Sequence, residues 1–335
     1  MGEFDLIERY FKAPARAMAQ QSSGVTLGIG DDCALLQPAA SMQLAISSDM
    51  LVAGRHFFAN VDPFTLGHKA LAVNLSDLAA CGANPLAFTL ALSLPQADEV
   101  WLAPFSRGLL ALAAEHHCAL IGGDTTQGPL NICITVFGEV PNHMALLRSG
   151  AQTGDDIYVS GTLGDARLAL EVMRGNLTQP AETFAAVKAR LETPTPRVTL
   201  GIALRGVASA AIDVSDGLLG DLGHILKQSK VGAVIDTSVA INLIAVQAVN
   251  TLANTQTKGQ ITLKKQLDYV LAGGDDYELL FTAPAAMREA VQAAAAASGT
   301  PVTRIGQIEA APGLRLIDGQ GQPVPNNFAS FDHFK

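Results

Sequence analysis

The sequence predicts a mixed α/β protein of two domains, and three observations support this fold class. The chain has 335 residues, and at roughly 150 residues per domain this length indicates two domains. Segments with the alternating pattern of β-strands are interleaved with segments of helical periodicity, which favours an α/β arrangement. Turn-forming residues are concentrated near the middle of the chain. We therefore predict an N-terminal domain at 1–140, a linker at 141–154 and a C-terminal domain at 155–335.

In the N-terminal part, apolar alternation predicts strands and longer apolar periodicity predicts helices. Between Phe88 and Leu94, four large apolar residues alternate with Thr, Ala and Ser, so that the apolar side chains share one face of a strand. Segments 43–47 and 131–137 are also typical of strands and are bounded by turn residues. Helices are predicted at 66–81, where the pattern ends at Gly82, and at 101–117.

The C-terminal part repeats this organisation. Strands are predicted at 156–161, 211–215, 232–236 and 277–282, and a helix is predicted to begin at Gly217. The segment 284–298 consists mostly of Ala with a few charged residues that are compatible with a helix. We interpret it as a surface helix with small packing contacts rather than as a disordered segment.

Composition excludes several classes of protein. The chain has 22 Lys and Arg against 31 Asp and Glu, a formal net charge of −9 at pH 7, whereas a general nucleic-acid binder has a basic face. No apolar run approaches the ~18 residues that span a bilayer. The N-terminus lacks the basic and apolar regions of a signal peptide, and the four cysteines, which form no C-x-x-C pair, favour buried reduced thiols. We expect a cytoplasmic protein without nucleic-acid or membrane partners.

The most informative feature is the position of the acidic residues. Five strand-like segments run into Gly or Ser and then into one or two Asp, at 28–32, 47–49, 122–124, 213–216 and 273–276. Ligands bind at the carboxyl ends of strands in open α/β sheets. In the helix predicted at 66–81, Asn74 and Asp77 are three residues apart and therefore face the same way. A single Asp after Gly is most often a turn or capping residue, but five repetitions with almost no cations alongside indicate a site.

Convergence of these carboxylates would require bound cations. Two unit charges 4 Å apart repel each other by about 4 kcal/mol at an effective dielectric constant of 20. Oxygen ligands without His or Cys select hard ions, and Mg²⁺ is the expected one. Because Mg²⁺ takes only one or two carboxylates and completes its shell with water and phosphate oxygens, many carboxylates predict several Mg²⁺ ions and a polyphosphate. The sequence contains no G-x-x-x-x-G-K-[ST] motif, and 24–30 does not fit the dinucleotide fingerprint.

Seven segments, in order along the chain, resemble motifs of the thiamine-monophosphate kinase family. They lie at 2–7, 30–34 (Gly-Asp-Asp-Cys-Ala), 48–57, 72–80 (Ala-Val-Asn-Leu-Ser-Asp-Leu-Ala-Ala), 122–126, 212–218 (Ile-Asp-Val-Ser-Asp-Gly-Leu) and 274–279, and the resemblance extends to 332–334. It implies ATP-dependent phosphorylation of thiamine monophosphate to thiamine diphosphate, the last step of that cofactor's biosynthesis. It also implies an aminoimidazole ribonucleotide synthetase-like architecture, in which the N-terminal sheet pairs with its twin in a homodimer and a larger C-terminal α/β domain follows.

The resemblance also implies roles for individual residues. It assigns Mg²⁺ to Asp32, Ser47, Ser48, Asp49, Asp77, Asp124, Asp213 and Asp216. It assigns ATP contacts to Gly123, Asp124, Arg148 and Ser215, and thiamine monophosphate contacts to His56, Asp275 and Phe328. Some relatives have Glu in place of Asp275 and Trp in place of Phe328. Without the resemblance, His56 would be interpreted as a packed histidine, Arg148 as a surface cation and Phe328 as a loop anchor.

No general base is expected for the implied reaction. The acceptor is a phosphate monoester, which is already largely dianionic at pH 7 because its second pKa is near 6. We therefore expect direct in-line transfer assisted by Mg²⁺, with ATP as the co-substrate. Two alternatives stay open: another ATP-using enzyme of the same superfamily, and a non-catalytic protein that binds a nucleotide or a thiamine phosphate. A selenophosphate synthetase would need a reactive N-terminal Cys and a hydrogenase-maturation protein a C-terminal one. Cys33 follows the Gly-Asp-Asp turn and the chain ends in Asp-His-Phe-Lys, so both are disfavoured.

Overall fold

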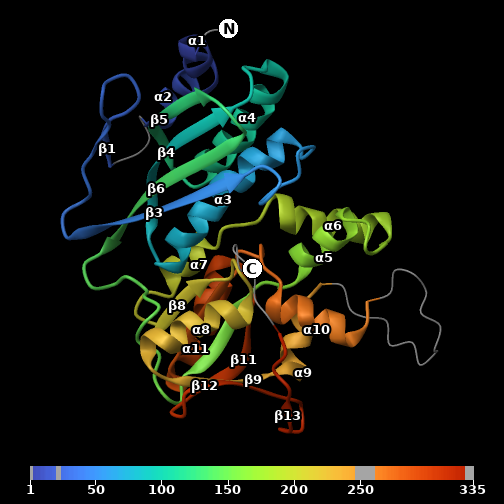
Figure 1. Ribbon diagram of the computed structural model, residues 1–335. Coiled ribbons are helices and arrows are strands. Elements are labelled where there is room, and N and C mark those ends of the chain that lie inside the picture. The colour runs from blue at the N-terminus through green and yellow to red at the C-terminus, as the bar shows by residue number, and fades with distance from the viewer. Residues whose placement is uncertain (1–2, 20–23, 246–260, 329–335) are drawn as a thin grey trace. The chain divides into compact units, whose positions relative to one another are not determined.

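The computed structural model describes residues 3–19, 24–245 and 261–328 (Figure 1). Apart from residues 79–81, the described chain up to Ala145 forms one compact unit. Residues 79–81 and the described residues from Leu146 onward form a second unit. None of the described helices combines the length and the apolar character that crossing a membrane requires. The segment 332–334, which contributed to the family resemblance, lies outside the described residues.

The first unit is built around a mixed four-stranded sheet. Its strands are β3 (Met42–Val52), β4 (Asn84–Leu94), β5 (Ala119–Gln127) and β6 (Asn131–Pro141), in the order β3-β6-β4-β5. β4 and β5 are parallel, and the other neighbours are antiparallel. The parallel pair is joined by the crossover helix α4 (Glu99–Glu115), because parallel strands need a long connection. The predicted alternation in β4 is confirmed, since Phe88, Leu90, Leu92 and Leu94 are all buried.

Helices α3 (Pro63–Ala80) and α4 lie on one face of this sheet (Figure 1). They approach each other through glycines: a Cβ atom on Gly67 would lie 2.1 Å from the carbonyl oxygen of Phe105, and one on Gly108 would lie 1.9 Å from that of Phe64. At the N-terminus, α1 (Glu3–Ile7), a π-helical turn (Glu8–Lys12) and α2 (Ala13–Ala19) are followed by the small sheet of β1 (Val25–Leu27) and β2 (Leu35–Leu36).

The second unit contains a seven-stranded mixed sheet. Its strands are β7 (Asp156–Ser160), β8 (Ala210–Asp213), β9 (Gly232–Asp236), β10 (Leu279–Ala283), β11 (Val302–Glu309), β12 (Gly313–Ile317) and β13 (Pro323–Val324). Their order is β13-β12-β9-β11-β7-β10-β8. Only the β9–β12 pair is parallel among these described strands. Both units therefore combine helices with a mixed sheet, and the predicted mixed α/β class is confirmed.

Helices accompany this second sheet. They are α5 (Asp165–Met173), α6 (Ala181–Glu192), α7 (Val198–Ala203), α8 (Leu218–Ser229), α9 (Thr237–Ala240), α10 (Leu263–Ala272) and α11 (Arg288–Ser298), with 3₁₀ turns at Ile241–Leu243 and Ala285–Met287. Buried residues of α5, α8 and α10 form one core with Val159 of β7 and Leu280 of β10. The predicted Ala-rich helix is confirmed as α11, which buries only Val291, Ala294 and Ala295.

The cysteines are free, as expected for reduced thiols. The expectation that they are buried holds for Cys118, and Cys81 and Cys133 are half-buried. For Cys33 the expectation is wrong, because this residue follows the exposed Gly-Asp-Asp turn and is itself exposed.

Candidate active site

In the first unit, strand β3 and helix α3 bring four of the polar residues singled out in the sequence together. The hydroxyl of Ser47 donates a short hydrogen bond to Oδ2 of Asp77. The backbone N–H of Asp49 donates to Oδ1 of Asn74 at 3.1 Å. Residues two apart on a strand and three apart on a helix each share a face. The prediction that Asn74 and Asp77 face the same way is therefore confirmed.

Ser48 lies on the opposite face of β3. Its Oγ donates to the carbonyl oxygen of Ile134 at 3.1 Å and pairs with Oγ1 of Thr135 at 3.0 Å, both in β6. Asp124 belongs to this second face as well, because it forms a cross-strand row with Ala91, Cys133 and Met50, two residues beyond Ser48. The residues assigned to Mg²⁺ in this sheet therefore fall into two groups, one on the α3 side and one on the other face.

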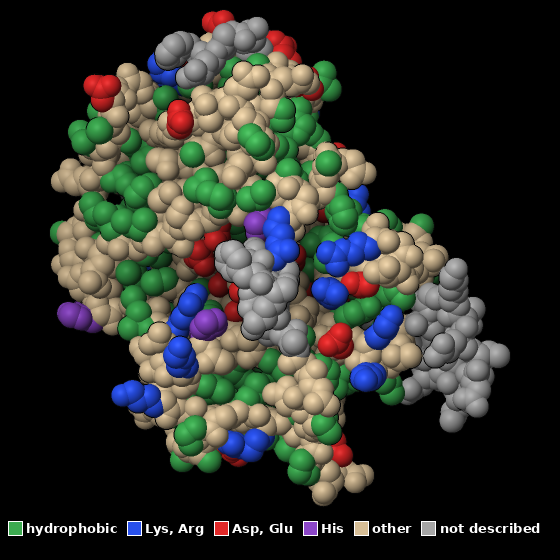
Figure 2. Space-filling view, in the orientation of Figure 1, with side chains coloured by type: hydrophobic (Ala, Val, Ile, Leu, Met, Phe, Trp, Pro, Cys, Tyr) green, Lys and Arg blue, Asp and Glu red, His purple; other side chains and the backbone are tan. Residues whose placement is uncertain are grey.

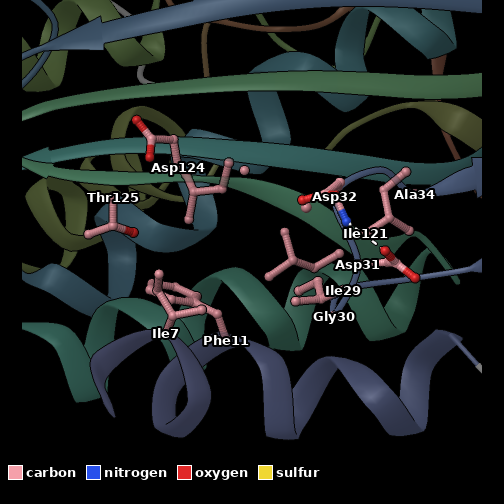
Figure 3. A pocket seen from close by; sticks show the side chains of 14 residues that line it. Ile7, Phe11, Ile29, Gly30, Asp31, Asp32, Ala34, Ile121, Asp124 and Thr125 are labelled. Atoms are coloured by element: carbon pink, nitrogen blue, oxygen red, sulfur yellow. Dashed lines mark hydrogen bonds between the residues drawn. The ribbon is translucent and has the colours of Figure 1, made fainter. Parts of the chain in front are cut away.

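Asp32, Gly123 and Asp124 line one cavity of about 170 Å³ in the first unit. Figure 3 shows Asp32 and Asp124 on one side of it and Ile7 and Phe11, from the N-terminal helical segment, on the other. The backbone N–H of Asp32 bonds to the side chain of Asp31 at 3.0 Å, so Asp31 has the turn-capping role of an Asp in a tight turn. The cavity combines an apolar wall with carboxylates.

Gly123 is held in a conformation that other residues rarely adopt. Its φ is +147°, and a Cβ atom there would lie 1.8 Å from the carbonyl oxygen of Leu90. The glycine therefore allows β5 to approach β4 closely beside Asp124.

The expectation that each of the five acidic segments follows a strand is wrong for three of them. Two lie inside strands, and the third, 273–276, follows helix α10 and precedes β10. Ser47, Ser48 and Asp49 lie in the middle of β3, and Gly123 and Asp124 lie in the middle of β5. Continuous pairing with β6 and β4 carries both strands past these polar residues. Strands β6 and β4 lie between Asp49 and Asp124. Three strand spacings therefore separate the backbones of these two residues, a distance of roughly 14 Å.

No three His, Cys, Asp or Glu side chains within 3–19, 24–245 and 261–328 are close enough together to hold a metal ion. Asp49 and Asp124 would therefore need separate ions. The donors themselves suit Mg²⁺, because carboxylate and hydroxyl oxygens converge at Ser47 and Asp77 without any His or Cys ligand.

In the second unit, Asp213, Ser215 and Asp216 lie where β8 leads into α8. Asp213 is the last residue of β8 and is buried. The backbone N–H groups of Ser215, Asp216 and Gly217 each donate to Oδ2 of Asp221 at 3.1 Å. Burial, together with repulsion from Asp216, raises the pKa of Asp221 to about 7.

A second turn, between α10 and β10, packs against the first one. The N–H of Asp275 donates to the carbonyl oxygen of Ser215 at 2.9 Å, and the N–H of Tyr277 donates to that of Val214 at 2.9 Å. Asp275 and Tyr277 both have positive φ, +67° and +51°, and the Tyr277 hydroxyl reaches Oδ1 of Asp275 at 3.3 Å. The structure thus brings Asp213, Ser215, Asp216 and Asp275 together on two adjoining turns.

A buried ion cluster lies behind the second turn. Glu278 is fully buried and accepts hydrogen bonds from Arg190 at 2.6 Å, from Nε of Arg197 at 2.7 Å and from Ser160 at 2.5 Å. Arg190 also donates to the carbonyl oxygen of Asp276 at 3.1 Å. Burial raises the pKa of Asp276 well above its usual value. These contacts fix the backbone that carries Asp275.

The remaining predicted site residues are placed separately. Nδ1 of His56, in the first unit, accepts from the backbone N–H of Val52 at 2.9 Å and thereby closes the turn after β3. In the second unit, Arg148 is exposed, and Phe328 packs partly buried against the core.

The sequence interpretation missed Asp221 and Glu278. Asp221 is an acidic residue in the first turn of a helix that follows a Ser-Asp-Gly turn. That position alone could have indicated an interaction with the N–H groups at the helix start. Glu278 lies within a quoted motif, but its partners Arg190 and Arg197 are more than 80 residues away along the chain.

Two family models match the chain. The N-terminal domain model of AIR synthase related proteins matches residues 30–140, and the C-terminal domain model of the same proteins matches 152–319. Together they cover all of the predicted site residues except Arg148, which lies between the two matches, and Phe328, which lies beyond the second one.

Several known proteins are similar over their full length. The thiamine-monophosphate kinase of Salmonella typhimurium is 46% identical, with 99% of this chain and 98% of the relative covered. The crystal structure of thiamine-monophosphate kinase from Stenotrophomonas maltophilia has 46% identity and a TM-score of 0.83, with 97% and 98% covered. A structure described as AaThiL complexed with AMPPCP and TMP has 29% identity and a TM-score of 0.73, with 99% and 97% covered. This chain therefore belongs to the thiamine-monophosphate kinase family, among the AIR synthase related proteins.

Proposed function

We propose that this protein transfers the γ-phosphoryl group of ATP to thiamine monophosphate and so forms thiamine diphosphate. The observation that carries this proposal is the 46% identity to a thiamine-monophosphate kinase over 99% of the chain. The similar structure with AMPPCP and TMP bound contains an ATP analogue together with the acceptor named here. The residues assigned to Mg²⁺ on the two faces of the first sheet carry carboxylate and hydroxyl oxygens, and so do the residues on the two adjoining turns of the second unit. Oxygen atoms of these kinds are suitable Mg²⁺ ligands for phosphoryl transfer.

The proposed Mg²⁺ ligands are the carboxylates and hydroxyls that the resemblance assigned. In the first unit they are Asp32, Ser47, Ser48, Asp49, Asp77 and Asp124, and in the second unit Asp213 and Asp216. Because Mg²⁺ prefers one or two carboxylates with water and phosphate oxygens, several ions are expected. Bound Mg²⁺ supplies positive charge that offsets the negative charge of the transferring group.

The proposed nucleotide contacts are Gly123, Asp124, Arg148 and Ser215. Gly123 has no side chain, and β5 lies close to β4 at this residue. Backbone atoms therefore line the cavity beside Asp124 at this position. Arg148 is exposed, and a guanidinium group can bind two phosphate oxygens at once. We assign it to the phosphates of ATP.

The proposed acceptor contacts are His56, Asp275 and Phe328. Asp275 is held by its bond to Ser215 and by Tyr277. Its carboxylate suits a cationic thiazolium ring, and the face of the Phe328 ring attracts a cation as well. His56 accepts through Nδ1, so the ring proton of the neutral imidazole is on Nε2, and we assign this residue to the acceptor.

Transfer is proposed to be direct. The acceptor oxygen is already deprotonated at pH 7, so the chain's residues need only hold the two phosphates in line and exclude water. A phosphorylated form of the protein after incubation with ATP alone would contradict direct transfer.

A homodimer is also proposed, with the open face of the first sheet as the contact. Leu44, Ile46 and Met50 of β3 are 41%, 61% and 52% exposed on this face. Figure 2 shows hydrophobic side chains gathered over the region where Figure 1 draws β3 and β6. Such a patch on a protein surface is typical of an interface. Sedimentation of the wild type and of an Ile46→Glu variant tests this, since the variant is expected to dissociate.

The experiment that tests the function is phosphoryl transfer measured with purified protein, ATP, Mg²⁺ and thiamine monophosphate. We expect thiamine diphosphate and ADP in equal amounts and no product with thiamine as the acceptor. Asp216→Asn is expected to fold as the wild type does and to lose most turnover. Tight ATP binding without ADP formation would instead support a non-catalytic binding protein.

A further inference from the structure

The turn between β8 and α8 contains a cradle of N–H groups that is already filled by a side chain of this unit. The N–H groups of Ser215, Asp216 and Gly217 converge on a single oxygen, Oδ2 of Asp221, at 3.1 Å each. Successive N–H groups at the start of a helix are a common binding site for phosphate oxygens. Here Asp221, which is 3% exposed, occupies that place from inside the unit.

The carbonyl side of the same turn is also occupied. The carbonyl oxygens of Val214 and Ser215 accept from the N–H groups of Tyr277 and Asp275, both at 2.9 Å. A buried backbone group needs a partner, and these contacts supply one on each side of the turn. These backbone contacts do not involve the side chains of Ser215 and Asp216, which are half-buried and can reach a ligand.

We propose that Asp221 is a positioning residue for the nucleotide site. By filling the N–H cradle it fixes the 215–217 turn, so that Ser215 and Asp216 bind their ligands through side chains and not through backbone N–H groups. This inference rests on the proposed function, which places Ser215 at ATP and Asp216 at Mg²⁺. It differs from phosphate-binding loops in which the N–H groups themselves hold the phosphate.

Removal of the Asp221 carboxylate leaves three N–H groups without their acceptor. The turn then gains freedom to shift or to admit water, and a shift of about 1 Å can cost on the order of a hundredfold in activity. Asp221→Asn keeps an oxygen that can accept the same bonds. Asp221→Ala removes the acceptor and is the informative change.

Asp156→Asn provides the matched control. Asp156 is a fully buried carboxylate of the same unit that accepts from Arg288 at 2.6 Å and from Arg304 at 3.1 Å. It pairs with Ala283 at one end of β10, whereas Asp213 pairs with Leu279 at the other end. Its loss weakens the unit without touching the 215–217 turn.

The test is calorimetric binding of AMPPCP in the presence of Mg²⁺, at a temperature where circular dichroism shows each variant to be folded. Asp221→Ala is expected to bind AMPPCP about tenfold more weakly. This effect is similar in size to that of removing the side chain of a strong helix N-cap. Asp221→Asn is expected to stay within about threefold of the wild type, a difference below 1 kcal/mol. Asp156→Asn is expected to bind as the wild type does.

Two results would overturn the proposal: wild-type affinity in Asp221→Ala, or an Asn variant as weak as the Ala variant. If Asp221→Ala does not fold, Ser215→Ala decides, because a side-chain contact predicts weaker binding and unchanged affinity contradicts it. Wild-type protein that binds AMPPCP but forms no thiamine diphosphate would refute the proposed function alone, since the binding comparison does not depend on transfer.

Discussion

The hydroxyl of Ser47 donates a hydrogen bond to the carboxylate of Asp77 and so joins the edge strand β3 to helix α3. Two residues further along the strand, Asn74 of the same helix accepts from the backbone of Asp49. The helix therefore holds the strand at two successive positions on one face. The carboxylate of Asp77 therefore lies beside a second oxygen that can serve as a metal ligand, and this arrangement does not require a bound ion.

Asp77→Asn is expected to leave the fold intact and to lower turnover by about a hundredfold or more, because the amide lacks the charge that attracts Mg²⁺. The measurement is kcat as a function of Mg²⁺ concentration. Asp62→Asn is the control, since the Asp62 side chain accepts a local bond from the N–H of Phe64 at the start of α3 and is not among the proposed ligands. Equal kcat in both variants would remove Asp77 from the proposed metal ligands.

Two neighbouring glycines of β5 are expected to respond differently to an added methyl group. Gly123→Ala forces a Cβ to within 1.8 Å of the Leu90 carbonyl oxygen at a positive φ, and is expected to destabilise the first unit by about 2 kcal/mol or more. Gly122→Ala places its Cβ 3.7 Å from Thr89 and is expected to be nearly neutral. Thermal unfolding of the two variants provides the comparison, and equal midpoints would contradict the close approach.

The contact between α3 and α4 gives a similar prediction. Gly67→Ala is expected to destabilise the protein by about 1–3 kcal/mol, because no space exists beside Phe105. Gly223→Ala in α8 meets no atom within 4 Å and is expected to stabilise by about 0.5–1 kcal/mol, since Ala is the better helix former. Urea unfolding measures both, and a stabilising Gly67→Ala would show that the helices can separate without cost.

The ion pairs of Asp156 predict a pH dependence of stability. Hydrogen bonds from Arg288 and Arg304 hold the pKa of Asp156 below its usual value. A lowered carboxyl pKa adds stability above the unfolded-state value, which is about 3.9, and that contribution disappears as the pH falls through the folded-state value. The stability difference between wild type and Asp156→Asn is therefore expected to be constant from about pH 5 to 7 and to shrink below about pH 4. A difference that persists at about pH 2 would point to packing rather than charge.

The sequence was sufficient for features that depend on local pattern. Alternation located β4, the Ala-rich segment located α11, and the three-residue spacing placed Asn74 and Asp77 on one face. The pattern failed where pairing with a neighbouring strand decides the outcome. Asp49 and Asp124 resemble residues at strand ends, yet β3 and β5 continue past them because β6 and β4 supply hydrogen-bond partners.

The role of Asp221 could not be predicted from its place in the sequence. Its acceptor geometry depends on a positive φ at Gly217 and on the turn around Asp275, which comes more than 50 residues later. Exposure of Cys33 was missed for a similar reason, since a short sequence pattern does not tell whether another segment will cover a turn.

The buried carboxylate of Glu278 affects when the second unit can fold during synthesis. Ser160, Arg190 and Arg197 leave the ribosome well before Glu278, and until then both guanidinium groups lack the anion that neutralises them. The early segments therefore have no complete partner set while the chain is still growing. Stable packing around β7 and α6 waits for β10, so this unit is expected to acquire its structure late and in one step.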